Sequence, residues 1–364
     1  MKSSLKCVDV VLGMQFGDEG KGKIVHHLCK SGKYNLVLRG SGGSNAGHTI
    51  YHKGIKHITH LVPAGVFFGI RSVIGPGCVV NLSKLFMECT TLADAGINVW
   101  SLLKIDKRAH VITAAHIADD AADCEVNGIG TTKQGIGPAY RDKCSRSGVQ
   151  IGTLVDNYNK EVVDNPFDST NFIPHFAHML TDTFDELHTA TEQICALYEG
   201  AQGHGLDIDW GDYPYVTSSH TTLAGAMLNG IPHTAIRHVY GVAKAYETYV
   251  GAKKFHNVNV IAERLQATGC EYGATTGRLR QVDFFHMPRL IRACTINGVT
   301  DLIINKCDIF EEVMNDKAEF LYYDSSGMLL KAHTMEAWKH ELTAAIVQNT
   351  CVKNVLFSYS PYEI

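Results

Sequence analysis

The chain has 364 residues, of which 45% are hydrophobic and 19% charged, so it can bury a large core and fold unaided. Its net charge of −4 provides no broad basic surface, which excludes nucleic acid as a partner. No 18 apolar residues follow one another and the first residues lack a secretory signal, so we expect no membrane insertion. Eleven cysteines without a C-x-x-C pair indicate reduced thiols in the cytoplasm.

Short apolar runs rich in β-branched residues predict buried strands. These runs are Val8–Leu12, Leu36–Leu38, Ser72–Ile74, Val258–Ile261 and Asp301–Ile304. Helical apolar spacing predicts helices over Lys23–Cys29, Phe176–Leu197 and Met335–Val347. The alternation predicts an α/β fold, with a mostly parallel central sheet flanked by helices as in P-loop NTPases. No linker marks a boundary, so we expect a single large domain over residues 1–364.

A glycine-rich segment, Gly13–Lys23, lies between the first predicted strand and the first predicted helix. Its glycines allow backbone N–H groups to point at one place, where the helix N-terminus adds partial positive charge. The segment therefore predicts a phosphate-binding loop, with an ordinary tight turn as the alternative. It is not a Walker A loop, since Gln15 and Gly22 break that pattern. Asp18 would be repelled by phosphate unless it binds magnesium or handles a proton, so it is a candidate for both roles.

Two further polar loops have the same character. Gly40–Thr49 follows another predicted strand and should emerge at the same edge of a parallel sheet. Within it, His48 is a candidate donor to a phosphate oxygen or general acid, although a structural histidine is the alternative. Gly128–Pro138 supplies hydroxyls and exposed backbone, with a flexible surface loop as the alternative.

Together these segments resemble the adenylosuccinate synthetase family. Its members carry loops like Gln15–Lys23 and Asn45–Thr49. Further matches follow in the family's order at Ile129–Tyr140, Glu199–Gly203, Leu206–Asp209, Tyr213–Ser219 and Gly273–Arg278. The resemblance spans residue 8 to about residue 310.

The resemblance implies a ligase that joins L-aspartate to C6 of IMP or dGMP, with GTP or ATP and Mg²⁺. Asp18 would take the N1 proton of the purine and bind magnesium together with the Gly47 carbonyl. O6 would then attack the γ-phosphate, while His48 and Lys21 stabilise the charge that develops. The amine of aspartate would finally displace phosphate from the 6-phosphoryl intermediate.

Other residues match the family's substrate contacts. Purine monophosphate contacts match Asn45, Thr132, Gln202, Thr217 and Arg278, and Arg146 matches an arginine that reaches the neighbouring subunit's substrate in a homodimer. Aspartate contacts match Thr275, Thr276, Arg278 and Arg280, because arginine forks suit carboxylates. Nucleotide and phosphate contacts match Gly17, Glu19, Gly20, Gly22, Lys23, Gly47, Thr49, Lys306 and Asp308, the last in a motif that reads guanine.

The chain departs from the usual family pattern toward a compact archaeal or bacteriophage branch. The departures are Phe16, Lys253–His256, Leu279, Gln281 and Ser358–Pro361. Phage enzymes of this type condense aspartate with dGMP, and would act in the host cytoplasm. The sequence leaves open whether the purine substrate is IMP or dGMP and whether the energy donor is GTP or ATP. It also leaves open the source organism and whether dimerisation needs substrate. The alternatives are a nucleotide-binding switch that does not ligate and an inactive homologue, although Asp18, Lys21 and His48 are intact.

Overall fold

A nine-stranded sheet forms the centre of the molecule. The structure, a computed structural model, describes residues 3–128, 130–160, 170–254, 259–273, 277–315 and 319–362. Within these residues the sheet has the order β17-β14-β11-β1-β10-β2-β5-β7-β9, and each neighbouring pair is parallel. The predicted α/β fold with a mostly parallel central sheet is therefore confirmed.

The central strands range from two residues in β9 to nine in β1 and β11. They are β1 (Leu5–Gly13), β2 (Leu36–Arg39), β5 (Arg71–Ile74), β7 (Leu103–Asp106), β9 (Leu180–Thr181), β10 (Ile194–Glu199), β11 (Ile236–Lys244), β14 (Asp301–Asn305) and β17 (Asn354–Phe357). A second sheet joins β12 (Tyr246–Tyr249), β13 (Gln281–His286), β15 (Phe320–Tyr323) and β16 (Leu329–Ala332). Two small pairs are β3 (His48–His52) with β4 (Ile55–Thr59), and β6 (Val79–Val80) with β8 (His110–Val111).

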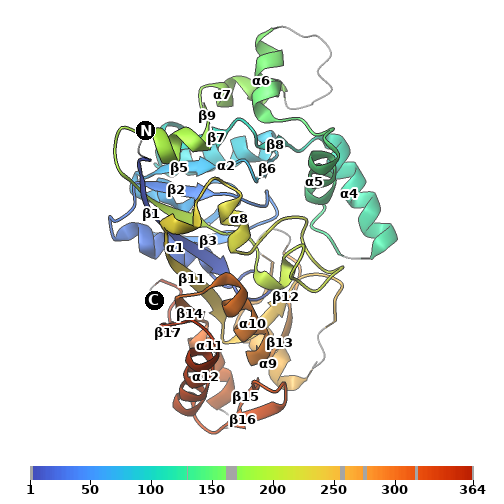
Figure 1. Ribbon diagram of the computed structural model, residues 1–364. Helices are drawn as coiled ribbons and strands as arrows, with labels where there is room; N and C mark the ends of the chain where they lie inside the picture. Colours follow the sequence, from blue (N-terminus) through green and yellow to red (C-terminus); the bar gives the residue numbers. More distant parts are fainter. Residues whose placement is uncertain are drawn as a thin grey trace.

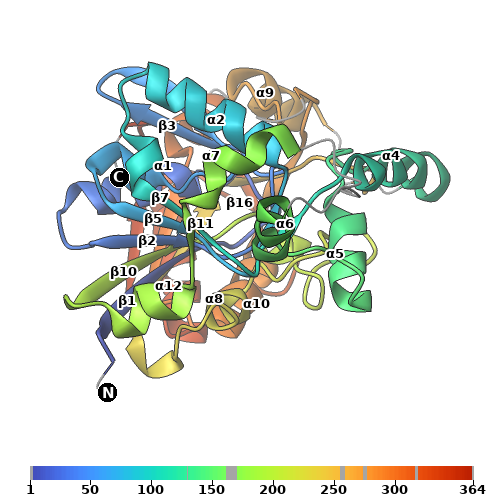
Figure 2. The ribbon, with the colours of Figure 1, turned by 90° about the horizontal axis from the view of Figure 1, so that it is seen from above.

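Helices cover both faces of the central sheet. They are α1 (Lys21–Lys30), α2 (Leu82–Asp94), α3 (Val99–Leu102), α4 (Ala114–Asn127), α5 (Ile136–Ser145), α6 (Ile151–Asn159), α7 (Ile173–Ala177), α8 (Leu223–Met227), α9 (Val260–Thr268), α10 (Met287–Asn297), α11 (Cys307–Asn315) and α12 (Met335–Asn349). Figure 2 shows α1, α2 and α7 on one side of the strands and α8, α10 and α12 on the other. In Figure 1 the second sheet gathers with α10, α11 and α12 at the lower end of the molecule.

Strand β1 explains why the core has two halves. Its residues from Cys7 to Gly13 are all buried, because helices cover the sheet on both faces. Successive side chains point to opposite faces, so Val10 joins the apolar cluster with α10 and α12, whereas Val11 joins the cluster with α1 and α2. Both clusters hold the carboxyl end of β1 in place.

Several predicted elements are confirmed. The strands predicted at residues 8–12, 36–38, 72–74 and 301–304 lie within β1, β2, β5 and β14. The helices predicted from Lys23 and from Met335 correspond to α1 and α12. Within the described part of the chain no helix is both long and apolar enough to cross a bilayer, and ten of the cysteines there are free thiols.

The helix predicted over Phe176–Leu197 is wrong. Helix α7 ends at Ala177, β9 follows, a single helical turn covers Asp185–Thr189, and β10 begins at Ile194. Leu180 pairs with Ile105 of β7, and Phe184 is exposed, so the apolar residues belong to separate elements. Sheet pairing outweighs a helical spacing that arises here by coincidence.

The strand predicted over Val258–Ile261 is also wrong, and Val258 lies outside the described residues. Asn259 caps α9, because its side chain accepts hydrogen bonds from the backbone N–H groups of Ile261 (3.0 Å) and Ala262 (2.9 Å). The β-branched residues therefore open a helix, and the asparagine cap was the stronger signal.

Candidate active site

One cavity of about 890 Å³ lies at the carboxyl ends of the central strands. Its walls come from the segments that follow β1, β2, β10 and β14, together with residues beside β12 and β13. Carboxyl ends of parallel strands meet at one edge of a sheet, which is where ligands of such folds bind. The prediction that the first two polar loops emerge together is confirmed.

The loop after β1 is shaped by a buried carboxylate. Glu19 accepts hydrogen bonds from the backbone N–H groups of Gln15 (3.2 Å) and Gly17 (2.8 Å) and from Lys21 Nζ (2.6 Å). Its carboxylate therefore holds the turn and positions Lys21. Gly20 has a φ of 91°, and a Cβ at Gly22 would lie 2.7 Å from His48 Cβ, so both positions require glycine.

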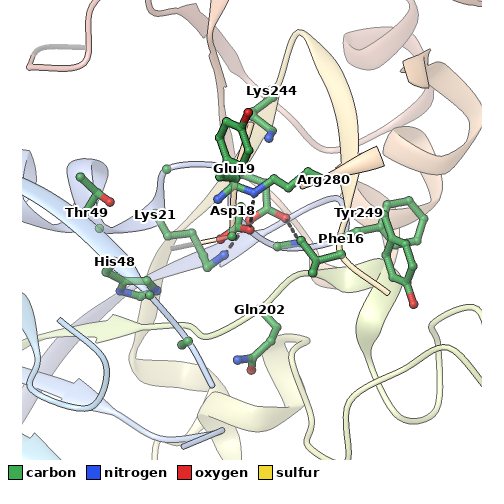
Figure 3. Close-up of a pocket in the computed structure, with 18 of the residues that line it drawn as sticks. Phe16, Asp18, Glu19, Lys21, His48, Thr49, Gln202, Lys244, Tyr249 and Arg280 are labelled. Carbon is green, nitrogen blue, oxygen red and sulfur yellow. Dashed lines mark hydrogen bonds and ion pairs between the residues drawn. The ribbon is translucent and has the colours of Figure 1, made fainter. Parts of the chain in front are cut away.

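Asp18 is the exposed carboxylate of this loop, and it forms an ion pair. Arg280 Nε lies 2.8 Å from Asp18 Oδ2 (Figure 3). The same guanidinium is ion-paired with Glu271. Lys244 Nζ lies 3.3 Å from Glu271, which also accepts a hydrogen bond from Tyr246. Four alternating charges thus link the wall of the cavity to the buried strand β11.

Burial and charge act against each other in this network. Burial lowers the pKa of Lys244 to about 8, even though the Glu271 carboxylate favours the charged amine. Burial alone would raise the pKa of Glu271, but Lys244 and Arg280 hold it at about 2. The carboxylate is therefore ionised at neutral pH.

His48 is held by a second buried carboxylate. Its Nδ1 lies 2.5 Å from Glu199 Oε1, and Glu199 Oε2 accepts from the backbone N–H of Ala64 at 2.8 Å. His48 Nε2 is buried and has no hydrogen-bond partner among the described residues. Burial lowers the pKa of His48, whereas Glu199 favours its charged form. Burial would raise the pKa of Glu199, but the hydrogen bond with His48 keeps it low, and Arg39, whose Nη1 lies 3.9 Å from Glu199 Oε1, contributes to the lowering.

Three lining residues that follow central strands have left-handed backbone conformations. Asp18, Gln202 and Lys306 have φ values of 60°, 52° and 64°. Such conformations are costly for residues other than glycine and gather at functional sites, where surrounding contacts hold them. Each of these residues follows a central strand, so the strain lies at the edge of the sheet that forms the cavity.

The far side of the cavity joins α1 to the last described residues. Lys23 Nζ donates to Ser358 Oγ (2.7 Å) and to the Ser360 carbonyl (2.9 Å), and burial lowers its pKa to about 8. Lys306 Nζ donates to the Gly269 carbonyl at 3.0 Å. Asp308 also lines the cavity.

Most of the residues expected at the site line this one cavity. They are Gly17, Asp18, Glu19, Gly20, Lys21, Gly22, Lys23, Asn45, Gly47, His48, Thr49, Thr132, Gln202, Thr217, Arg280, Lys306 and Asp308. Arg278 lies outside the lining, where it donates to the carbonyls of Gly130 and Thr131. Arg146 ends α5 on the surface and does not line the cavity. Thr275 and Thr276 lie outside the described residues.

Sequence reasoning assigned no role to Glu199, Arg39, Lys244 or Glu271. Glu199 stands in a recognised motif, and Arg39 is its partner in register on β2. For Lys244 the available signal was a lone lysine in the apolar strand β11. No local signal identified Glu271, because its partners come from β11 and from Arg280.

The chain matches known proteins along most of its length. The family model described as adenylosuccinate synthetase matches residues 10–173 and 161–345. The adenylosuccinate synthetase of Helicobacter pylori strain Shi470 is 38% identical over 354 residues, which cover 89% of this chain and 84% of that protein. The protein of the same name from Brugia malayi is 38% identical over 350 residues, covering 86% and 80%.

Solved structures have the same fold. The fully ligated adenylosuccinate synthetase from Plasmodium falciparum has a TM-score of 0.80 at 27% identity, and 98% of each chain is covered. The succinoaminodeoxyadenylate synthetase of cyanophage S-2L, bound to dGMP and dATP as an energy donor, has a TM-score of 0.72 at 20% identity, covering 98% and 93%. This second likeness shows the fold alone. The chain belongs to the adenylosuccinate synthetase family, whose members are nucleotide-driven C–N ligases of purine biosynthesis.

Proposed function

We propose that this enzyme condenses L-aspartate with IMP, drives the reaction with GTP and Mg²⁺, and acts in the cytoplasm as a homodimer. The observation that carries the proposal is that Asp18, Lys21 and His48 line the same cavity as Arg280. A base, a phosphate-neutralising cation and an oxyanion donor are the groups that phosphoryl transfer to O6 needs. Arg280 adds a fork for a dicarboxylate substrate.

In the first step Asp18 accepts the N1 proton of the purine. The O6–Pγ bond then forms while the bond from Pγ to the bridging oxygen breaks, which releases the nucleoside diphosphate. Lys21 would leave Glu19 to neutralise the transferring phosphoryl group, and His48, whose Nε2 has no partner among the described residues, lines the same cavity. In the second step the aspartate nitrogen bonds to C6, the C6–O6 bond breaks, phosphate leaves and the nitrogen loses a proton.

The oxygen atoms at the site suit magnesium. Mg²⁺ prefers carboxylate and carbonyl oxygens and usually keeps several waters or phosphate oxygens as ligands. Asp18 and the Gly47 carbonyl line the cavity, whereas the Glu19 carboxylate is occupied by backbone N–H groups and Lys21. Asp18 and Gly47 would therefore hold the ion. Bound Mg²⁺ would neutralise phosphate charge.

We propose GTP as the donor because Asp308 lies on the nucleotide wall, where a carboxylate can accept hydrogen bonds from guanine N1 and N2. Adenine offers no such pair of donors. Ser358 and Ser360 stand where the family usually has other residues. Both accept a hydrogen bond from Lys23, which lines the cavity.

We propose that Arg146 serves the neighbouring subunit, because it is exposed at the end of α5 and does not line the cavity of its own chain. We also propose that residues 1–364 act as a single domain. The cavity is lined jointly by loops of the central sheet and by residues beside β12 and β13.

The test is to incubate purified enzyme with Mg²⁺, L-aspartate, GTP or ATP, and IMP, GMP or dGMP in turn, and to identify the products by mass spectrometry. We expect the aspartate adduct from IMP with GTP, accompanied by equimolar phosphate. If dGMP were the only purine nucleotide to give a product, dGMP rather than IMP would be the substrate. No product from any combination would refute the ligase proposal.

A further inference from the structure

A buried carboxylate outside the cavity lining holds the ring of His48. Glu199 ends β10, its side chain is fully buried, and its Oε1 lies 2.5 Å from His48 Nδ1. His48 begins β3, so the two residues are brought together from segments separated by 151 positions. We propose that Glu199 is a positioning residue that fixes the orientation and tautomer of His48, so that Nε2 faces the transferring phosphoryl group. This inference rests on the proposed function.

The hydrogen bonds of Glu199 determine the tautomer. An ionised carboxylate only accepts hydrogen bonds, so Nδ1 of His48 carries the proton that lies between them. The other oxygen, Oε2, accepts from the Ala64 backbone N–H at 2.8 Å, so the carboxylate cannot turn away without leaving that buried N–H unpaired. Nε2 is then the ring nitrogen left for a substrate. It is buried and has no protein partner among the residues described.

Arg39 completes the arrangement behind Glu199. It ends β2 in register with Glu199, is fully buried and places Nη1 3.9 Å from Oε1. Its positive charge stabilises the ionised carboxylate in a region closed to water. The charged groups that face His48 are thus Glu199 from β10, Arg39 from β2 and Lys21 from α1. Among these, Glu199 is the one that contacts the ring directly.

Because the backbone N–H of Ala64 is a fixed donor, substitution of Glu199 by glutamine tests the tautomer of His48. In Glu199→Gln the amide oxygen must accept from Ala64, which turns the amide NH₂ toward His48 Nδ1. The ring then has to accept at Nδ1, so its proton moves to Nε2. In Ser-His-Asp triads the same exchange of carboxylate for amide leaves the histidine in the wrong tautomer with large losses in rate.

Nitrogen-15 NMR of histidine-labelled, ligand-free enzyme tests the inference without turnover. Comparison with His48→Gln assigns the His48 signals among the 19 histidines. We expect the Nδ1–H tautomer in the wild type and the Nε2–H tautomer in Glu199→Gln. An Nε2–H tautomer of His48 in the wild type would overturn the inference even if Glu199→Gln does not fold, and so would an unchanged tautomer in Glu199→Gln.

Kinetics provide the second readout. We expect Glu199→Gln to lower kcat on the order of 100-fold or more with little change in the KM for IMP, because Glu199 does not line the cavity. The double variant with His48→Gln should be no slower than His48→Gln alone. Additive losses would show that Glu199 does not act through His48. Asp9→Asn is the matched control, since Asp9 is a buried carboxylate on neighbouring β1, bonded to Tyr34 and Arg237.

The two proposals fail in different ways. If the wild type gives no product with any substrate, the proposed function fails, whereas the NMR result still decides the tautomer. If the wild type is active and Glu199→Gln keeps both full kcat and the Nδ1–H tautomer, the positioning role alone is refuted.

Discussion

Arg280 Nε lies 2.8 Å from Oδ2 of Asp18, so the proposed aspartate-binding arginine is ion-paired with the proposed catalytic base. This ion pair holds the Asp18 carboxylate against the guanidinium of Arg280. Aspartate, which offers two carboxylates, would compete with Asp18 for the guanidinium fork. Arrival of the second substrate would therefore release the base for the first chemical step.

The ion pair between Arg280 and Asp18 predicts which kinetic constants change when Arg280 is substituted. Arg280→Lys keeps the charge but loses the planar fork, so we expect the KM for aspartate to rise about 10- to 100-fold with a smaller change for IMP. Steady-state rates at varied aspartate measure this. Arg141→Gln, which alters an exposed arginine paired with Asp119, is the control and should leave both constants unchanged. An unchanged KM for aspartate in Arg280→Lys would contradict the assignment.

Asp18 should be indispensable for turnover. Asp18→Asn removes the proton acceptor and a magnesium ligand at nearly constant shape, so we expect kcat to fall on the order of 100-fold or more. Aspartate-dependent phosphate release measures the loss, with the exposed Asp119→Asn as control. Full turnover in Asp18→Asn would remove the central step of the mechanism.

Asp308 should determine the choice of nucleotide. Asp308→Asn replaces a carboxylate that accepts from guanine with a side chain that also donates, so we expect kcat/KM for GTP to fall about 10- to 100-fold while that for ATP changes little. Glu312→Gln, an exposed carboxylate on the same helix α11, is the control. If both nucleotides lose equally, Asp308 does not read the base.

The buried Glu271 should make the stability of the folded enzyme depend on pH in the acid range. Its pKa is about 2 in the folded enzyme and near 4.5 when unpaired, so the unfolded state binds more protons and the stabilising effect is lost as pH falls from about 4.5 to about 2. Glu271→Gln leaves Lys244 and Arg280 without this counter-charge, which should cost about 3 to 5 kcal/mol at neutral pH.

Thermal unfolding of the wild type and Glu271→Gln at pH 7 and at lower pH measures the effect. The difference between the midpoint temperatures of the two proteins should narrow as pH falls from about 4.5 to about 2. Glu319→Gln, which breaks an exposed pair with Lys331, should change stability by less than about 0.5 kcal/mol. A constant gap would show that Glu271 is not ionised in the folded enzyme.

The edge of the sheet at which ligands bind was predictable because it depends on local patterns. Apolar strands followed by glycine loops, as at Gly13 and Gly40, place polar residues at one edge of a parallel sheet. The glycines of the first loop and the helix N-terminus behind it indicate a phosphate site without reference to any family. Motifs such as Glu199–Gly203 located further walls of the cavity without showing what each residue does.

The errors have physical causes. The Phe176–Leu197 segment has helical spacing, but Leu180 and Ile194 pair with strands distant in sequence. At Asn259 a local cap outweighed β-branched residues. The contact of Glu199 with His48 and the ion pair of Glu271 with Lys244 join residues 151 and 27 positions apart. Such contacts depend on how the strands are ordered in the sheet, which no short segment encodes.

The link between Lys23 and the Ser358–Ser360 segment has a practical consequence. Ser360 and Pro361 line the cavity, and Tyr362 packs its ring edge-on against Tyr51 of β3 at 4.9 Å. A label attached at Ser360 or Tyr362 would lie beside the nucleotide compartment and distort measured affinities. Leu5, at the opposite end of β1 from the phosphate loop, marks the safer side for such a handle.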